Sequence, residues 1–253
     1  MSAGPRNYLG GETPQERSIK NRMTAVDWIY RFGFTSAQVL RLCLHKQSSS
    51  WASIAVKRGL LRSTKTESGV PGVIYTLSGP GLELAERHSP KLLPYPELDP
   101  YRVNQATIRH NLLVQEMTIK AISSKKIVRV TTEKEWNSGD QRGHKRPDAI
   151  WHFANGQRTG IEMELSAKWD RKLDEFIVGI AAALNAESPE DRLDDFAIIT
   201  DSEAIAQRYR QAMQPGATLR HWRKNDRHHW EVESQAQVPA WLQDHVEIRM
   251  VPM

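Results

Sequence analysis

Four prolines within 13 residues divide this chain into two parts. The segment His88–Pro100, HSPKLLPYPELDP, can form neither a regular helix nor an interior strand, because proline lacks an amide proton and has a fixed φ angle. It predicts a linker over residues 89–100 between a first domain (21–88) and a second (101–253). Residues 1–20 are polar and rich in glycine and proline, which predicts a flexible arm before the first domain.

The pattern of the first domain predicts three short helices, then a two-stranded hairpin. Apolar residues recur at helical spacing between Asn21 and Phe32, and Gly33 follows as a C-cap. Thr35 or Ser36 is expected to cap the second helix, and Ser50 the third. The later elements expected are a helix over Trp51–Arg58, strands over Leu60–Ser63 and Val73–Leu77, and a short helix after Ser78.

Positive charge is concentrated in this first domain. The whole chain has a net charge of +5, yet ten bases and one acid lie between Arg17 and Lys65. Such a local excess is typical of a module that binds phosphate groups of nucleic acid. A solvated basic face is the alternative interpretation.

The second domain is predicted to be a mixture of helices and strands, so that the fold class of the chain is α+β. Asn155-Gly156 is a strong hairpin signal between two of the strands. The elements expected are helices over 103–122, 168–184 and from Asp201 to Met213, and strands over 127–131, 147–153, 160–165 and 196–200.

Three acids of this second domain suggest a metal site. Asp148 begins one strand of the hairpin, and Glu162 and Glu164 lie on the next strand, where alternate residues point the same way. Buried carboxylates repel one another unless a counter-charge is present. Mg²⁺ or Mn²⁺, which prefers oxygen ligands, would supply it. We therefore expect Asp148, Glu162 and Glu164 to be metal ligands.

Several classes of protein are not expected. Cys43 is the only cysteine, which excludes an intramolecular disulfide and a cysteine-based zinc site. The longest uncharged apolar run, Phe176–Leu184, is too short for a membrane span, and the N-terminus lacks a secretory signal. We expect a cytoplasmic protein without membrane insertion.

The first domain resembles the winged helix-turn-helix superfamily, particularly its MarR-like branch, in the order of its elements and in the segments KRGLL and YTLSGPG. The resemblance implies that the third helix enters the major groove of double-stranded DNA, with the hairpin along the backbone. Trp51 is expected to pack in the core. The expected DNA-binding residues are Ser49, Ser50, Ser53, Lys57, Arg58, Arg62 and Lys65.

The second domain resembles the PD-(D/E)XK nuclease superfamily over RPDAIWHFANGQRTGIEMELSAK. Together with TIRHNLLVQE, the order of motifs resembles the replication-relaxation family, which includes the MOB-C relaxases of conjugative and mobilizable plasmids. The resemblance implies a restriction-endonuclease-like domain. Its active-site positions would be Asp148, Glu162, Glu164 and Lys168, with Glu116 as an additional acid.

The sequence departs from these families at two points. Glu164 stands where the superfamily usually has lysine, so Lys168 would have to reach back into the site. The tyrosine that MOB-C relaxases carry after the motif is missing from residues 169–173. Tyr209 is a distant candidate for attack on DNA, and a surface position on a helix is the alternative for it.

The resemblance implies a site-specific DNA-binding protein of a mobile element that nicks DNA with Mg²⁺ or Mn²⁺. Other mobilisation or conjugation proteins and a second copy of the chain are potential partners. The alternative is a catalytically inactive regulator or accessory factor that uses the nuclease-like domain for dimerisation or partner docking. A third hypothesis, a winged-helix module for protein interaction, predicts no affinity for duplex DNA.

Overall fold

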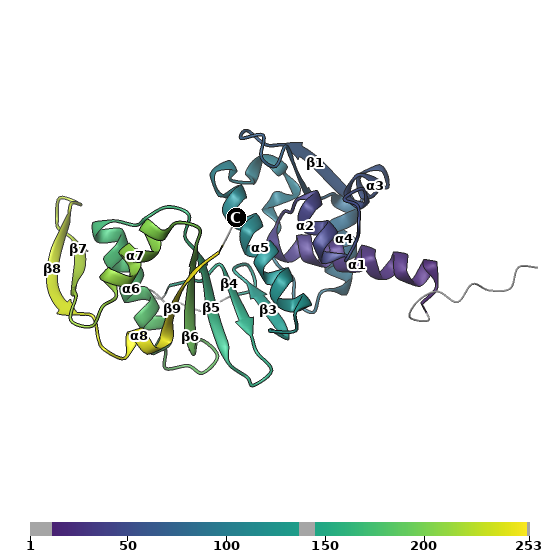
Figure 1. Ribbon diagram of the computed structural model, residues 1–253. Coiled ribbons are helices and arrows are strands. Elements are labelled where there is room, and N and C mark those ends of the chain that lie inside the picture. Colours follow the sequence, from purple (N-terminus) through teal and green to yellow (C-terminus); the bar gives the residue numbers. More distant parts are fainter. Residues whose placement is uncertain (1–11, 137–144, 252–253) are drawn as a thin grey trace, which may run out of the picture. The chain divides into compact units, whose positions relative to one another are not determined.

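The computed structural model describes residues 12–136 and 145–251 of the chain, which combine helices with several β-sheets. The chain divides into unit 1, up to Glu116, and unit 2, from Met117 onward. The boundary lies inside helix α5 (Ile108–Ser123), and not at the proline-rich segment where the sequence predicted it (Figure 1). The α+β class is confirmed.

Unit 1 contains its elements in the order that the sequence predicts. Ser36 and Ser78 cap α2 and α4 through their hydroxyls, whereas Ser50 precedes α3 without a capping hydrogen bond from its side chain. Strands β1 and β2 pair as an antiparallel hairpin. The elements are α1 (Pro14–Phe32), α2 (Ala37–Cys43), α3 (Trp51–Lys57), β1 (Leu61–Lys65), β2 (Val73–Leu77), α4 (Gly79–His88) and the short 3-10 turns Pro96–Leu98, Pro100–Arg102 and Gln105–Thr107.

Helix α1 begins at Pro14, so the prediction of a flexible arm over residues 1–20 is wrong for residues 14–20. The Thr13 hydroxyl accepts a hydrogen bond from the backbone of Glu16, and the Glu16 carboxylate accepts one from the backbone of Thr13. This reciprocal capping box, together with a proline at the first helical position, starts the helix. The rest of the predicted arm, residues 1–11, lies outside the described residues.

The proline-rich segment packs into the core of unit 1 and is not a free linker. Leu93 is buried, and its backbone N–H and carbonyl both bond to the Tyr30 hydroxyl, at 2.6 and 3.1 Å. The Tyr95 hydroxyl donates to the carbonyl of Gly33 at 2.6 Å and accepts from the amide of Leu77 at 2.8 Å. Two tyrosines thus fix the segment to α1 and β2.

The first half of α5 is held in unit 1 by one buried side chain. Gln115 is fully buried, and its amide oxygen accepts hydrogen bonds from the Trp28 indole and the Thr35 hydroxyl, both at 2.9 Å. Its amide nitrogen donates to the carbonyl of Phe34, also at 2.9 Å. The three bonds explain why the unit boundary follows Gln115 so closely.

Unit 2 is built on a five-stranded mixed sheet of order β3-β4-β5-β6-β9. Strand β4 is antiparallel to both β3 and β5, whereas β6 is parallel to both β5 and β9. The sequence predicted the first four strands but not β9. The elements are β3 (Arg129–Thr132), β4 (Ala149–His152), β5 (Arg158–Met163), α6 (Asp170–Leu184), β6 (Asp195–Thr200), α7 (Glu203–Ala212), β7 (Thr218–Lys224), β8 (Trp230–Gln237), α8 (Leu242–His245) and β9 (Val246–Met250).

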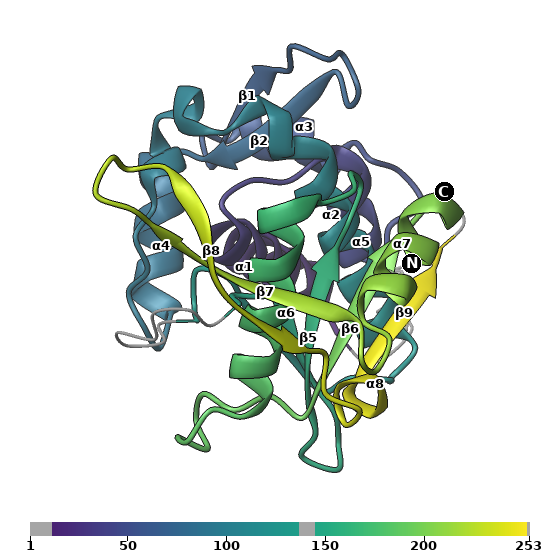
Figure 2. The same cartoon turned by 90° about the vertical axis from the view of Figure 1, so that its left-hand side faces the viewer.

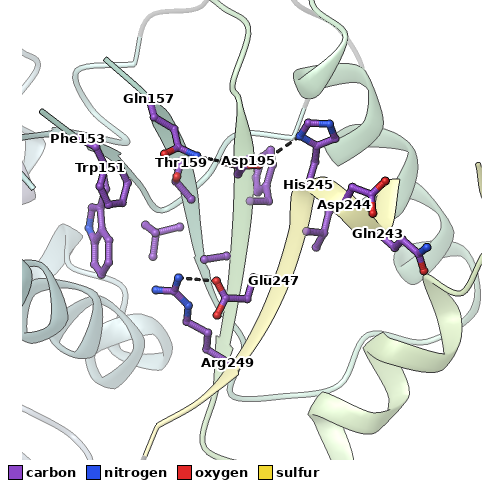
Figure 3. A pocket seen from close by; sticks show the side chains of 14 residues that line it. Trp151, Phe153, Gln157, Thr159, Asp195, Gln243, Asp244, His245, Glu247 and Arg249 are labelled. Carbon is purple, nitrogen blue, oxygen red and sulfur yellow. Dashed lines mark hydrogen bonds and ion pairs between the residues drawn. The ribbon is translucent and has the colours of Figure 1, made fainter. Parts of the chain in front are cut away.

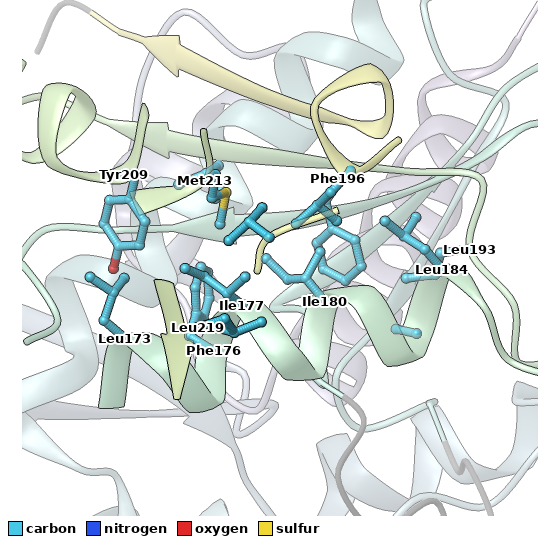
Figure 4. Close-up of a cluster of buried hydrophobic side chains, with 14 of the residues drawn as sticks. Leu173, Phe176, Ile177, Ile180, Leu184, Leu193, Phe196, Tyr209, Met213 and Leu219 are labelled. Carbon is cyan, nitrogen blue, oxygen red and sulfur yellow. The ribbon is translucent and has the colours of Figure 1, made fainter. Parts of the chain in front are cut away.

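The main core of unit 2 lies between one face of this sheet and helices α6 and α7 (Figure 4). Phe196 and Ile198 of β6 contribute from the sheet, and Phe176 and Ile180 contribute from α6. The antiparallel ribbon β7–β8 packs beside α6 (Figure 2). On the other face of the sheet, the Trp151 indole donates to the hydroxyl of Thr118 on α5 at 3.1 Å. Within the described parts of the chain, no helix combines the length and the apolar character that crossing a membrane requires.

Replacing Gln115 by leucine should destabilise unit 1. The change keeps the side-chain volume but leaves the Trp28 indole, the Thr35 hydroxyl and the Phe34 carbonyl buried without their partner, so the free energy of unfolding should fall by about 2 kcal/mol or more. Urea denaturation of the full chain measures this. Gln47→Leu, at an exposed position, is the control and should change stability by less than about 0.5 kcal/mol. Equal stability of the two variants would contradict the prediction.

Candidate acid and lysine centre

The backbone of β5 holds Asp148 beside the two glutamates. The Asp148 amide donates to the carbonyl of Ile161 at 2.9 Å, and its carboxylate accepts from the amide of Met163 at 2.8 Å. Glu162 belongs to β5, and Glu164 follows the end of the strand. The structure therefore brings the three predicted acids to neighbouring positions at one end of the β4–β5 hairpin.

Both glutamates are buried, and each is paired with a lysine. Glu162 and Glu164 are only 4% and 3% exposed. The Lys145 ammonium lies 2.7 Å from a carboxylate oxygen of Glu162, and the Lys168 ammonium forms an ion pair with Glu164. Lys168 thus reaches back into the site as the sequence required. Sequence reasoning missed Lys145, although it lies only three residues before Asp148.

An aromatic ring lies beneath the two ammonium groups. The centroid of the Phe176 ring is 4.5 Å from the Lys168 nitrogen and 5.8 Å from the Lys145 nitrogen. A cation over an aromatic face is attracted by the ring's quadrupole. Phe176 on α6 therefore helps to hold both lysines above the buried carboxylates.

Tyr209 is a core residue, so the interpretation as a surface helix residue is wrong. Its side chain is fully buried, and its ring meets the Phe176 ring edge-on with centroids 5.4 Å apart. Burial, and then the negative charge of Glu164, raise the pKa of the Tyr209 hydroxyl. A buried hydroxyl with a raised pKa is poorly suited to attack DNA, so the geometry does not support Tyr209 as a nucleophile.

The charge of Glu162 is incompletely compensated. Burial and repulsion by Asp148 raise the pKa of Glu162 to about 8, against the opposing effect of Lys145. One of its carboxylate oxygens, Oε2, is buried without a hydrogen-bond partner among the described residues. An additional cation near this oxygen and Asp148 would stabilise the ionised form.

Asp148 and Glu162 are the two residues best placed to hold such a cation, whereas Glu164 is occupied by Lys168. Across residues 12–136 and 145–251, no three His, Cys, Asp or Glu side chains are grouped so that they could hold a metal ion. The three-carboxylate metal site thus stays a prediction. Glu116, the additional acid, is half-buried on α5 and is the last residue of unit 1, whereas the other acids belong to unit 2.

The predicted DNA-binding residues all lie on the surface of unit 1. They are exposed on the segment before α3, on α3 and its C-cap, and on β1. The Arg62 guanidinium donates to the carbonyl of Leu98 at 3.1 Å, which fixes its position on the hairpin. Trp51 packs against the core of unit 1, as expected. The seven exposed residues are Ser49, Ser50, Ser53, Lys57, Arg58, Arg62 and Lys65.

A separate pocket of about 550 Å³ lies in unit 2, on the face of the five-stranded sheet opposite to the acid and lysine centre (Figure 3). Ile161 lines it, and since neighbouring residues of a strand point to opposite faces, Glu162 points away from it. Several of its polar side chains pair with one another, as Asp195 does with His245 and Glu247 with Arg249. The pocket is therefore distinct from the acid and lysine centre.

Comparison of the chain with models of protein families, with curated proteins and with solved structures finds no match. The function proposed below rests on the residues and their geometry.

The pair between Lys145 and Glu162 should be strongly coupled in stability. Removing one partner leaves a buried charge unpaired, whereas removing both removes the penalty, so a double-mutant cycle with Lys145→Met and Glu162→Gln should give about 1–3 kcal/mol. The pair between Lys20 and Glu12, whose side chains are 68% and 40% exposed, is the control and should give less than about 1 kcal/mol. Chemical denaturation of the full chain measures both cycles, and a coupling near zero for Lys145 and Glu162 would show that the buried pair does not form.

Proposed function

We propose that this protein binds double-stranded DNA through a winged helix in unit 1 and nicks one strand at a divalent-metal centre in unit 2. The observation that carries the proposal is the buried carboxylate of Glu162, which lies beside Asp148 and is paired with Lys145, and of which one oxygen has no hydrogen-bond partner among the described residues. Mobilisation of a plasmid or relaxation of a replicating element is the corresponding cellular role.

The order of elements in unit 1 supports DNA binding. Three helices and a β-hairpin are the parts of a winged helix, and the bases of this region are exposed on α3 and β1. Lys57, Arg58, Arg62 and Lys65 would contact phosphates and supply affinity without sequence choice. Ser49, Ser50 and Ser53, at the start of α3, would approach phosphates or base edges.

The residues of unit 2 fit a two-carboxylate site for Mg²⁺ or Mn²⁺, because one oxygen of Glu162 has no hydrogen-bond partner among the described residues and the Asp148 carboxylate lies beside this glutamate. When bound, such an ion would orient the phosphate and lower the pKa of a water molecule. Lys145 would release Glu162 and turn toward the DNA backbone. Lys168 would stabilise the negative charge that develops on the pentavalent phosphate.

The proposed role of Glu164 differs from the metal ligand that the sequence predicted. Because its carboxylate is paired with Lys168, Glu164 acts as a positioning residue that fixes the ammonium group, and not as a metal ligand. A glutamate at the usual lysine position thus remains compatible with catalysis, since it holds the lysine that has moved four residues along the chain.

The alternative function is a DNA-binding regulator whose nuclease-like domain is inactive and serves in dimerisation or in docking to mobilisation proteins. One observation favours it: each buried glutamate already has a lysine as its counter-charge. A cluster of this kind can be purely structural, and would then need no metal.

Alanine substitution at Arg58 or Lys65 should weaken duplex binding to a similar degree for all DNA sequences. Each lost phosphate contact should also lower the slope of log affinity against log salt by about 1. Fluorescence anisotropy with a labelled duplex at several salt concentrations measures this. Lys126→Ala, an exposed base of unit 2, is the control and should keep the original slope. An unchanged slope in both unit 1 variants would exclude these residues from the interface.

Glu162→Gln should abolish nicking while DNA binding is retained. The loss of the carboxylate charge should lower the rate by roughly 100-fold or more, in line with the removal of other groups that stabilise charge in a transition state. Conversion of supercoiled plasmid to open circles in Mg²⁺ or Mn²⁺ gives the rate, and Glu187→Gln is the matched control at an exposed position.

Calorimetric titration with Mn²⁺ separates the two functions. The enzyme should bind Mn²⁺, and Asp148→Asn should abolish that binding. If the wild-type chain gives no binding heat and no nicking, unit 2 has the regulatory role.

A further inference from the structure

An exposed tryptophan lies directly beside the acid and lysine centre. Trp169 follows Lys168 in the chain, and its side chain is 61% exposed. The Arg208 guanidinium is stacked on its ring, 3.3 Å from the ring centroid, and the same side chain donates to the carbonyl of Lys168 at 2.8 Å. Arg208 therefore fixes both the indole ring and the backbone next to the site.

A second tryptophan of similar character lies near the start of α6. Trp230 on β8 is 43% exposed, with the Arg171 guanidinium 4.0 Å and the Lys224 ammonium 5.3 Å from its ring centroid. Lys224 and Trp230 are paired across the β7–β8 ribbon, which packs beside α6. We call Trp169, Arg208, Trp230, Arg171 and Lys224 the tryptophan surface.

Two other tryptophans of unit 2 have a structural role, because their indole groups form hydrogen bonds within the fold. The Trp222 indole donates to the buried carboxylate of Asp174 at 2.8 Å, and Trp151 is buried against Thr118. In the described part of the chain, the indole nitrogen of Trp169 forms no hydrogen bond, and no carboxylate forms an ion pair with Arg208 or Lys224. Trp169 thus exposes a large part of its apolar ring, while the Arg208 guanidinium is stacked on the ring.

Exposed indole rings next to cations are suited to nucleic acid with unpaired bases. A base that is free of its partner stacks on an aromatic ring, while arginine and lysine contact the adjacent phosphates. The faces of bases within a duplex are already stacked and cannot be reached. The chemistry therefore favours a single strand over a duplex at this place.

We propose that the tryptophan surface binds the unpaired bases of single-stranded DNA beside Lys168. This inference rests on the proposed function and specifies its substrate: the strand that reaches the acid and lysine centre would be locally unpaired. Trp169 would be the principal stacking residue because it is the most exposed and the nearest in sequence to the site.

The test is binding of a fluorescein-labelled oligo(dT) by the full chain in buffer with EDTA, followed by anisotropy. Trp169→Ala should weaken this binding by roughly 5- to 100-fold, the effect expected for the loss of one stacked base. Trp169→Phe, which keeps an aromatic face, should restore most of the affinity. Tyr101→Ala, at an 89% exposed aromatic residue of unit 1, should leave it unchanged.

Two further measurements complete the test. Duplex binding by the Trp169→Ala variant should equal that of the wild type, and an unchanged urea denaturation curve should show that unit 2 of the variant is folded. Unchanged oligo(dT) binding in Trp169→Ala, or the same loss in the phenylalanine variant as in the alanine variant, would overturn the inference. Stronger binding of an oligo(U) of the same length would overturn the assignment to DNA.

The Glu162→Gln variant keeps the two proposals distinguishable. Its binding of oligo(dT) should remain sensitive to Trp169→Ala. If the wild-type chain does not nick DNA but this sensitivity is found, the nuclease proposal fails and the single-strand surface stands.

Discussion

The burial of two carboxylates between a sheet and a helix is the constraint on which unit 2 depends. Glu162 and Glu164 point into the space that α6 covers, where an ionised carboxylate requires positive charge nearby. Lys145 and Lys168 supply it from opposite ends of the motif. The Lys145 backbone also donates to the carbonyl of Gly179 on α6 at 2.9 Å. The ion pair of Lys145 and this hydrogen bond together tie the entry of β4 to strand β5 and to helix α6.

The ion pairs between the lysines and the buried glutamates also link the structure of unit 2 to its proposed function. The lysines neutralise the buried glutamates in the structure, and in the proposed function the same ammonium groups would bind phosphate. The charge of Glu162 is the less well compensated of the two, because one of its oxygens has no hydrogen-bond partner among the described residues and Asp148 repels its charge. Glu164 has one lysine and holds it over Phe176. The two positions of the motif therefore differ in role although they share a face of the strand.

Local signals in the sequence were sufficient for most elements, and long-range packing accounts for the errors. Caps at Ser36 and Ser78 and the Asn155-Gly156 turn are encoded by neighbouring residues, so the helices and hairpins could be predicted. The capping box at Thr13 was also local and could have placed the start of α1. In contrast, the packing of Leu93 and the pairing of β9 with β6 depend on residues far away in the chain.

In the candidate site, too, local patterns could be predicted from the sequence and long-range contacts could not. Strand alternation predicted that Glu162 and Glu164 share a face, but not that Lys145 would pair with Glu162, since that contact crosses the hairpin. Tyr209 lies between two arginines, which suggested a surface position. Its spacing from Ile205 and Met213 in fact follows one helical face, and that face is buried.

The backbone before α6 separates the inner centre from the outer tryptophan surface. Trp169 has extended backbone angles, φ −131° and ψ 152°, and adjacent side chains of an extended segment point to opposite sides. Lys168 can therefore turn inward to Glu164 while Trp169 turns outward to solvent. If the helix began one residue earlier, this alternation would be lost and the two residues would lie about 100° apart around a helix axis. The extended residue at the start of α6 is thus what allows a charged centre and an aromatic surface to lie next to each other.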